Sequence, residues 1–404
     1  MRLITPLVLL VAATFGLAED ASERVNSTAT LTGRIDAAMK RGVDFLVEDQ
    51  NENGSWGSAT RTKGLNIYAP LPGAHHAYRA GSTGLALAGM IDANDQRPEV
   101  QASIRKAGDW SAEHLPKLRR ADPTTTYNVW GHAYGLKSLT RLYNATDDKE
   151  MKAKWKQLGQ QQVDLANRYA DVNGGWGYLD VFDEIRTQKP SGLPTAFTTA
   201  TMLLAMAEGR DAMGVELNQK IVNASLKSIR MQRTPDFSYV YSFPHRRVPR
   251  GDINRPAGSL ARSQTCNAAM RVFGDKAVTD EVLVQWADRF IAREGFMRNT
   301  RKRPVPHEGP FKLAGYFYYY GCFYFTESVK LLPKDKQAKH AALIAETILP
   351  LQETDGSWWD YPLYDYHQPY GTGYALMTLA WCRDVLKEAG GEAGKDAGAE
   401  IKTQ

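Results

Sequence analysis

Three short turns with the same residues recur along this chain at multiples of one spacing. They are Gly54-Ser55-Trp56, Gly174-Gly175-Trp176 and Gly356-Ser357-Trp358, and their tryptophans lie 120 and 182 residues apart. Both gaps are multiples of about 60 residues, a period typical of an internal repeat. The same period predicts further copies near residues 116, 237 and 297. Six units of one repeat are therefore expected.

The three intervening positions carry weaker copies. Met231-Gln232 precedes Asp236-Phe237-Ser238-Tyr239, and Arg293-Glu294-Gly295-Phe296 keeps a glycine and an aromatic residue. Leu115-Pro116 occupies the remaining position by its spacing alone.

Each unit pairs an amphipathic segment with an apolar one. Before the turns, apolar residues recur every four positions, as at Val278, Val282, Trp286 and Phe290. After the turns, segments such as 84–90, 198–207 and 373–381 are apolar or small nearly all round. An amphipathic helix lies at a surface, whereas a helix apolar on every side must be enclosed.

Six such pairs predict an all-α protein, an (α/α)6 toroid with six inner helices inside six outer helices. An open solenoid is the alternative, but its end repeats would carry polar caps. The first and last apolar segments are as apolar as the middle ones, which favours a closed ring.

The recurring residues have structural roles in this interpretation. Glycine ends an outer helix in the left-handed conformation. Tryptophan packs between adjacent outer helices and has one N–H group to place. The preceding glutamines (Gln50, Gln161 or Gln162, and Gln352) are expected to hydrogen-bond backbone groups at neighbouring helix ends.

The ends of the chain differ in composition from the repeats. Residues 1–18 combine Arg2, an apolar run and Gly16-Leu17-Ala18, a pattern typical of a signal peptide for export. We expect a linker at 19–33, one toroid domain at 34–388 and a disordered tail rich in Gly, Ala and charges at 389–404. No later stretch has about 18 uninterrupted apolar residues, so no stable membrane span is predicted.

Charge and cysteine content exclude some classes of function. A net charge of +5 is too small to indicate a nucleic-acid partner. Cys266, Cys322 and Cys382 lie in apolar segments without Cys-x-x-Cys spacing, so buried thiols are expected. A zinc site formed by His75, His307 and His367 is conceivable, but no local histidine spacing supports it, and no metal site is predicted.

One pattern recurs about every 60 residues between paired helices: Gln, a short spacer and Gly-x-Trp. It resembles the QW repeat of the squalene cyclase and protein prenyltransferase superfamily. The resemblance covers residues 34–388 and is strongest at copies one, three and six. It implies the (α/α)6 toroid and a reaction cavity that accepts isoprenoid chains and opens where the inner helices begin.

The catalytic motifs of that superfamily are incomplete here. Its cyclases protonate their substrate with Asp-x-Asp-Asp, which does not occur in the sequence; Asp147-Asp148 lacks the third carboxylate. Its prenyltransferases bind zinc with Asp, Cys and His. Asp365-Tyr366-His367 resembles the histidine segment, but Leu313-Ala314-Gly315 stands where the Asp-x-Cys pair would be, and Cys322 lies about two turns further along.

The loops before the inner helices are rich in side chains capable of chemistry. If the N-termini of the inner helices surround one mouth of the toroid, these loops line it, and the helix dipoles there favour anions. Five of the eight histidines fall in these loops. The residues expected to line the mouth are His75, His76, Tyr127, Asp180, Asp183, His307, Glu308, Asp360, Tyr366 and Tyr370. The alternative for each is a solvated loop residue.

Asp365 and His367 are the candidate catalytic residues. A carboxylate can orient a nearby imidazole and raise its basicity, which suits acid–base chemistry near neutral pH. The alternative is that Asp365 only caps the following helix. A candidate anion site, for a diphosphate or an acidic glycan, is formed by Arg246, Arg247, Arg250 and Arg301. These arginines are otherwise a solvated face.

Three functions are compatible with these features. The first is an exported prenyltransferase- or squalene-cyclase-like protein that binds an apolar or isoprenoid small molecule in a central cavity. The second is a lyase or hydrolase acting on an acidic polysaccharide. The third is a non-catalytic interaction module. The sequence identifies no cofactor, reaction or oligomeric state.

Overall fold

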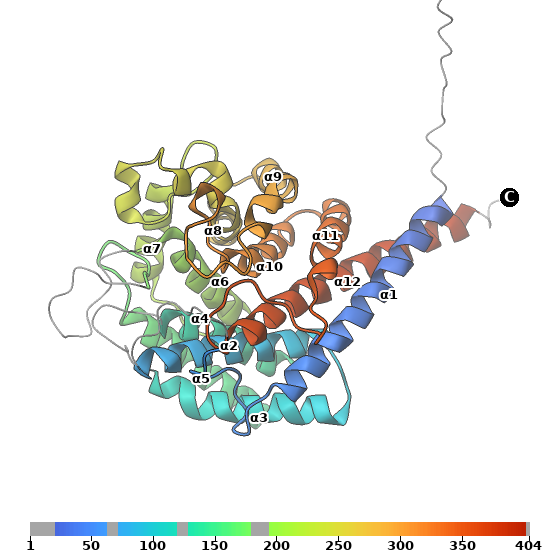
Figure 1. The fold of residues 1–404 in the computed structure, drawn as a ribbon, viewed down its shortest axis with the longest axis horizontal. Coiled ribbons are helices and arrows are strands. Elements are labelled where there is room, and N and C mark those ends of the chain that lie inside the picture. Colours follow the sequence, from blue (N-terminus) through green and yellow to red (C-terminus); the bar gives the residue numbers. More distant parts are fainter. Residues whose placement is uncertain (1–20, 63–71, 119–127, 179–193, 401–404) are drawn as a thin grey trace, which may run out of the picture.

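The structure, a computed structural model, describes residues 21–62, 72–118, 128–178 and 194–400 (Figure 1). Twelve α-helices make up most of this part of the protein. The outer helices are α1 (Ala21–Glu48), α3 (Pro98–His114), α5 (Lys149–Asn167), α7 (Gln219–Gln232), α9 (Asp280–Arg298) and α11 (Lys334–Ile348). The inner helices are α2 (Pro72–Ala93), α4 (Asn128–Asn144), α6 (Ala196–Met213), α8 (Leu260–Val272), α10 (Phe317–Val329) and α12 (His367–Glu400). Within these ranges the only β-structure is two isolated bridges.

The inner helices form a closed ring. Each packs against the next, from α2 to α12, and α12 returns to pack against α2. Small residues permit this last contact: a Cβ atom at Gly373 of α12 would collide with the carbonyl oxygen of Leu85 in α2. Figure 1 shows α1 and α12 side by side, where the first and last repeats meet. The predicted (α/α)6 toroid is confirmed.

The three Gly-x-Trp turns share one geometry. Gly54, Gly174 and Gly356 have φ angles of 89°, 88° and 91°, the left-handed conformation that favours glycine. A Cβ atom at any of them would strike a backbone carbonyl group of the outer helix of another repeat. These carbonyls belong to Lys106 in α3, Ala224 in α7 and Arg41 in α1, respectively. The third contact joins the last repeat to the first.

Each tryptophan links an outer helix to an inner one. The indole N–H of Trp56 donates to Leu46 O at 2.7 Å, and its backbone N–H donates to the Thr83 hydroxyl at 3.0 Å. Equivalent pairs of bonds join Trp176 to Ala166 O and Thr199, and Trp358 to Ile348 O and Thr372. All three tryptophans are fully buried. These hydrogen bonds give the tryptophans a structural role, but between an outer and an inner helix, whereas packing between adjacent outer helices was predicted.

The glutamines follow the prediction only in part. Gln50 donates to Ser103 O at 2.9 Å, and Gln352 donates to Ala38 O at 2.9 Å, so both join neighbouring outer helices. The sequence analysis predicted bonds to backbone groups at helix ends, but these two carbonyls lie inside α3 and α1. Gln162 instead shares a 2.8 Å hydrogen bond with the imidazole of His132 in α4, because it lies within α5, whereas Gln50 and Gln352 follow the ends of their helices.

One weak copy has the structure of the strong ones, and another does not. At the fourth position, Thr234 N donates to Ser238 O and Phe237 N to Thr234 O, the same bonds that Asn51, Gly54 and Ser55 make in the first turn. At the fifth position the sequence interpretation is wrong: Gly295-Phe296 lies within α9, which continues to Arg298. Glycine costs a helix only about 1 kcal/mol, so it did not end this one.

Helices extend beyond the predicted domain limits at both ends. α1 begins at Ala21, inside the predicted linker, and α12 continues to Glu400, through most of the predicted tail. Ala, Glu and Lys are good helix formers, which is consistent with helical structure at both ends. The predicted signal peptide, residues 1–18, lies outside the described residues.

Candidate functional site

The first aromatic layer spans the ring near the N-termini of the inner helices. Trp130 of α4 and Tyr320 of α10, which face each other across the ring, have ring centroids 6.5 Å apart. Phe197 of α6 contacts Phe317 of α10 at 5.2 Å. Side chains therefore fill the axis at this level. The ligand that the sequence placed in a central cavity would have to lie above this layer, at the mouth.

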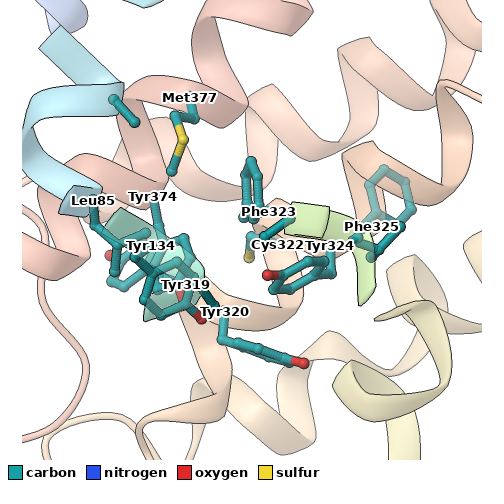
Figure 2. Close-up of a cluster of buried hydrophobic side chains, with 14 of the residues drawn as sticks. Leu85, Tyr134, Tyr319, Tyr320, Cys322, Phe323, Tyr324, Phe325, Tyr374 and Met377 are labelled. Atoms are coloured by element: carbon teal, nitrogen blue, oxygen red, sulfur yellow. The ribbon is translucent and has the colours of Figure 1, made fainter. Parts of the chain in front are cut away.

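The interior next to this layer contains several tyrosines, packed with Phe323, Phe325 and Met377 (Figure 2). The hydroxyl of Tyr374 in α12 donates to that of Tyr134 in α4, and Tyr320 shares a 3.0 Å hydrogen bond with Thr201 in α6. Burial raises the pKa of the Tyr134 and Tyr374 hydroxyls, so these phenols stay neutral. The aromatic residues of α10 thus pack the core, rather than lining an open wall.

An ion-pair cluster lies at the opposite end, near the C-termini of the inner helices. The buried Lys137 ammonium lies 2.6 Å from Glu208 and 3.8 Å from Glu327, and Arg141 bonds both Glu208 and Asp92. Burial lowers the pKa of Lys137, whereas Lys330 and Lys137 hold the pKa of Glu327 below its usual value despite its burial. Charged side chains therefore bridge α2, α4, α6 and α10 at this end.

Arg262, in the first turn of α8, is a large charged side chain buried at the mouth, with 1% of its surface exposed. Its guanidinium donates to Gly258 O at 2.8 Å, to Ile253 O at 2.6 Å and to Tyr239 O at 3.4 Å. The rings of Tyr241 and Phe317 lie 5.3 and 5.9 Å from the guanidinium carbon. No described carboxylate pairs with it.

Two histidines and two tyrosines surround this arginine. His307 Nε2 shares a 3.2 Å hydrogen bond with the Tyr316 hydroxyl, and its ring lies 5.6 Å from that of Tyr241. His245 Nδ1 shares a 2.7 Å bond with the Ser242 hydroxyl. Burial, reinforced by the charge of Arg262, lowers the pKa of both imidazoles, so both are neutral at neutral pH.

The candidate catalytic residues have separate partners. The Asp365 carboxylate accepts a hydrogen bond from Ser58 at 2.9 Å, and burial raises its pKa while Ser58 opposes that shift. His367 is fully buried; its Nδ1 bonds Tyr364 O at 2.6 Å, and its ring meets Trp359 edge to face. No described bond joins Asp365 to His367.

Asp360, another predicted mouth residue, has a buried carboxylate with a shifted pKa. It is fully buried and accepts hydrogen bonds from Tyr370 Oη at 2.6 Å and from Tyr319 N at 3.0 Å. Burial raises its pKa to about 6, against the opposing effect of these bonds and of Arg301. Because Tyr319 N lies in the first turn of α10, Asp360 caps this inner helix. Arg301 itself donates to Trp359 O at 3.0 Å.

His75, in the first turn of α2, lies against Tyr366. His75 Nδ1 shares a 3.0 Å hydrogen bond with the Tyr366 hydroxyl. The His75 ring also meets that of Tyr364 edge to face, at 4.9 Å. His307 is bonded elsewhere, to Tyr316 and to Lys312 O, so the three histidines considered for zinc have different partners. Across the described residues, no group of three or more His, Cys, Asp or Glu side chains could hold a metal ion.

The other predicted residues contribute little to the described mouth. His76, Glu308, Arg247 and Arg250 are exposed, and Arg246 folds over Phe243 with its guanidinium carbon 3.4 Å from the ring centroid. Tyr127, Asp180 and Asp183 lie outside the described residues. The three cysteines are free and buried, as expected. Of the helices described, none is both long and apolar enough to cross a membrane.

Sequence reasoning missed Arg262, Tyr241 and Trp130. A signal for Arg262 was present, because it is the only charged residue between Arg255 and Arg271, in a segment otherwise apolar, small or uncharged. Such a charge on an enclosed helix must be buried. Tyr241 gave no comparable signal.

Comparison with known proteins identifies the fold class. No protein-family model and no curated protein matches the chain. Among solved structures, a type II terpene cyclase from Scytonema, in complex with geranylgeranyl dihydroxybenzoate, is 13% identical over 88% of this chain and 99% of its own, with a TM-score of 0.50. The cellobiose 2-epimerase from Spirochaeta thermophila is 13% identical over 89% and 98%, with a TM-score of 0.54.

A family 76 glycoside hydrolase from a bovine Bacteroides thetaiotaomicron strain is 10% identical over 86% of this chain and 77% of its own, with a TM-score of 0.55. At these identities the likeness establishes the fold alone. The protein belongs to the class of (α/α)6 toroids, a fold shared by proteins that act on terpenoids and on carbohydrates.

Proposed function

We propose that this is an exported protein of the squalene cyclase and prenyltransferase type that binds an apolar, isoprenoid-like small molecule at the mouth of the toroid. The aromatic layer at the mouth carries the proposal. Trp130, Tyr178, Tyr316 and Tyr370 are only partly buried there, and together with Phe197 they offer ring faces and edges to a ligand. Aromatic surfaces of this kind suit isoprenoid chains.

The proposal concerns binding rather than a reaction. Acid–base catalysis by Asp365 and His367 would require a proton path between them, and their described bonds lead to Ser58 and to Tyr364 O instead. In this proposal both residues hold the loop before α12 in place. Such a role suits a loop at the edge of a binding site.

An acidic carbohydrate is the second candidate ligand. The buried Arg262, two neutral histidines and several tyrosine hydroxyls favour it, because sugar rings stack on aromatic side chains and uronic acids carry carboxylates. The similarity in fold to a glycoside hydrolase is compatible with either ligand.

Native mass spectrometry and lipid extraction of the purified protein test the first proposal, followed by titration with the isoprenoid alcohol farnesol. We expect a co-purified apolar molecule, and Trp130→Leu should weaken farnesol binding by about tenfold because a stacking surface is lost. Phe296→Leu is the matched control, since Phe296 lies on outer helix α9 and is 37% exposed.

Two results would contradict this proposal. One is the absence of any co-purified lipid together with depolymerisation of polygalacturonate, which would favour the second candidate. The other is equal farnesol affinity in Trp130→Leu and the wild type. Sequencing the N-terminus of the mature protein tests export: cleavage after Ala18 is expected.

A further inference from the structure

We propose that Arg262 recognises an acidic group of the ligand, so that the molecule bound at the mouth carries a phosphate, sulfate or carboxylate. This inference rests on the proposed function and names the chemistry of its ligand more closely. The inference is based on the buried guanidinium of Arg262, whose described hydrogen-bond partners are all neutral.

Arg262 differs from three less buried arginines in what neutralises its charge. Arg141 bonds Asp92 and Glu208, Arg271 bonds Asp280, and Arg233 bonds Asp275. Arg262 is more buried than any of these, yet its three described acceptors are backbone carbonyls. A buried ion without a counter-ion is costly, and an acidic ligand would supply one.

The guanidinium also has unused hydrogen-bonding capacity. It carries five N–H groups, of which three are directed to carbonyls. The buried Nε has no acceptor among the described residues. A buried donor left without an acceptor is unusual, and bonds from a guanidinium to an anion are among the strongest hydrogen bonds in proteins.

Arg262 lies close to the proposed ligand surface. The rings of Tyr241 and Phe317 cover it, and Tyr241 in turn contacts Phe197 and His307. Its charge reaches beyond these rings, because it favours the neutral forms of His245 and His307. An anion placed among these groups would meet a positive potential in a site largely shielded from water.

A purely structural role for Arg262 predicts something different. Its three carbonyl contacts fasten the loop 239–258 to α8, and that role would affect stability without distinguishing acidic from neutral ligands. The test therefore compares ligands that share an apolar chain and differ in charge.

The experiment titrates the full-length protein with farnesol, farnesoic acid, farnesyl diphosphate and digalacturonate by calorimetry. We expect the wild type to bind one or both farnesyl acids at least about tenfold more tightly than farnesol. Arg262→Gln should abolish this preference, because it should weaken binding of the acids more than binding of farnesol. Arg271→Gln is the control: it removes an arginine from the far end of the same helix and should retain the preference.

Each other outcome is decisive. If the wild type binds farnesol and the farnesyl acids equally well, the inference about Arg262 is wrong, while the proposed function stands. This result is obtained without any variant. Retention of the preference by Arg262→Gln also overturns the inference. Binding of digalacturonate alone, lost in Arg262→Gln, contradicts the isoprenoid ligand but supports the role of Arg262. Failure of the wild type to bind any probe contradicts both proposals.

Discussion

Arg262 and Asp360 are both buried at the mouth of the toroid, and burial shifts the pKa of each toward its neutral form. Arg262 stays charged, with its pKa lowered only to about 10 by burial. Asp360 has its pKa raised to about 6, so that it changes its protonation within the range in which the protein can be studied. Its ionisation therefore has a measurable effect on stability.

Asp360→Asn tests this effect. A carboxyl group whose pKa is higher in the folded than in the unfolded state stabilises the fold when protonated, below the ordinary value of 3.8, and this contribution is lost as the pH rises through about 6. The loss is on the order of 3 kcal/mol. The asparagine variant cannot ionise, so we expect its stability to fall less than that of the wild type between pH 4 and 7.

Thermal or urea unfolding across this pH range gives the measurement. Asp252→Asn serves as the control, because Asp252 is exposed and its ion pair among the described residues is a 3.5 Å contact with the exposed Arg255. Parallel stability curves for Asp360→Asn and the wild type would show that Asp360 is already ionised at low pH, stabilised by its bonds from Tyr370 and Tyr319.

Individual site residues were only partly predictable. His75 bonds Tyr366, and Tyr370 bonds Asp360. All four residues were expected around one mouth, so contacts among them were foreseeable. The pairing of Asp365 with His367 was inferred from proximity in the sequence. Residues two apart need not face each other, and here their side chains turn to Ser58 and to the Tyr364 backbone.

Among the structural elements, the Gly-x-Trp turn shows how a short motif can specify a contact between repeats. The glycine is needed twice: for its positive φ and for the close approach of a neighbouring helix. The fourth turn keeps the same bonds with Phe237 at a φ of 61°, so the backbone conformation alone does not require glycine.

Three glycine-to-alanine variants separate these two requirements. Gly174→Ala combines strain at φ with a collision against Ala224 O, and we expect a loss of about 2–5 kcal/mol of stability. Gly274 has a φ of 82° but open space around it, so Gly274→Ala should cost about 1 kcal/mol. Gly33 lies within α1 with nothing near it, and Gly33→Ala should gain about 0.5–1 kcal/mol.

Urea denaturation of the three variants measures these differences. The same loss for Gly174→Ala and Gly274→Ala would mean that the neighbouring helix moves aside at no cost. In that case the turn would depend on its backbone conformation and not on the contact between repeats.

The elements were predictable where periodicity and turn residues agreed. The pattern of apolar residues separated inner from outer helices, and Gly-x-Trp marked three helix ends. The prediction of a turn at the fifth copy was wrong because a glycine alone does not show whether a helix ends there. The residues after the glycine must also break the helix. Gly295 and Phe296 are followed by Met297 and Arg298, which continue α9.

At the scale of the whole molecule, the closed ring joins the last repeat to the first through both its outer and its inner helices. Gln352 and Gly356 of the last turn contact α1, and Gly373 of α12 lies against Leu85 of α2. An open solenoid would lack these contacts, and its repeats would unfold more independently. Closure should therefore make unfolding cooperative around the entire ring.

Gly373→Ala tests this cooperativity. A Cβ atom at this position would collide with Leu85 O, so we expect a loss of about 2–5 kcal/mol. If the ring unfolds as one unit, the amides of α6, on the opposite side, should lose hydrogen-exchange protection as much as those of α2. Loss of protection confined to α2 and α12 would show that the ring opens locally at this junction.

The side-by-side arrangement of α1 and α12 (Figure 1) has a consequence for how the chain can be connected. A closed ring has no intrinsic first repeat, since every repeat has a neighbour on both sides. Circular permutation should therefore be tolerated: a linker would join the two existing termini, and new ones would be cut in a surface connection such as the one between α6 and α7. The order in which the ribosome makes the six repeats would change, while the set of contacts in the folded protein would stay the same.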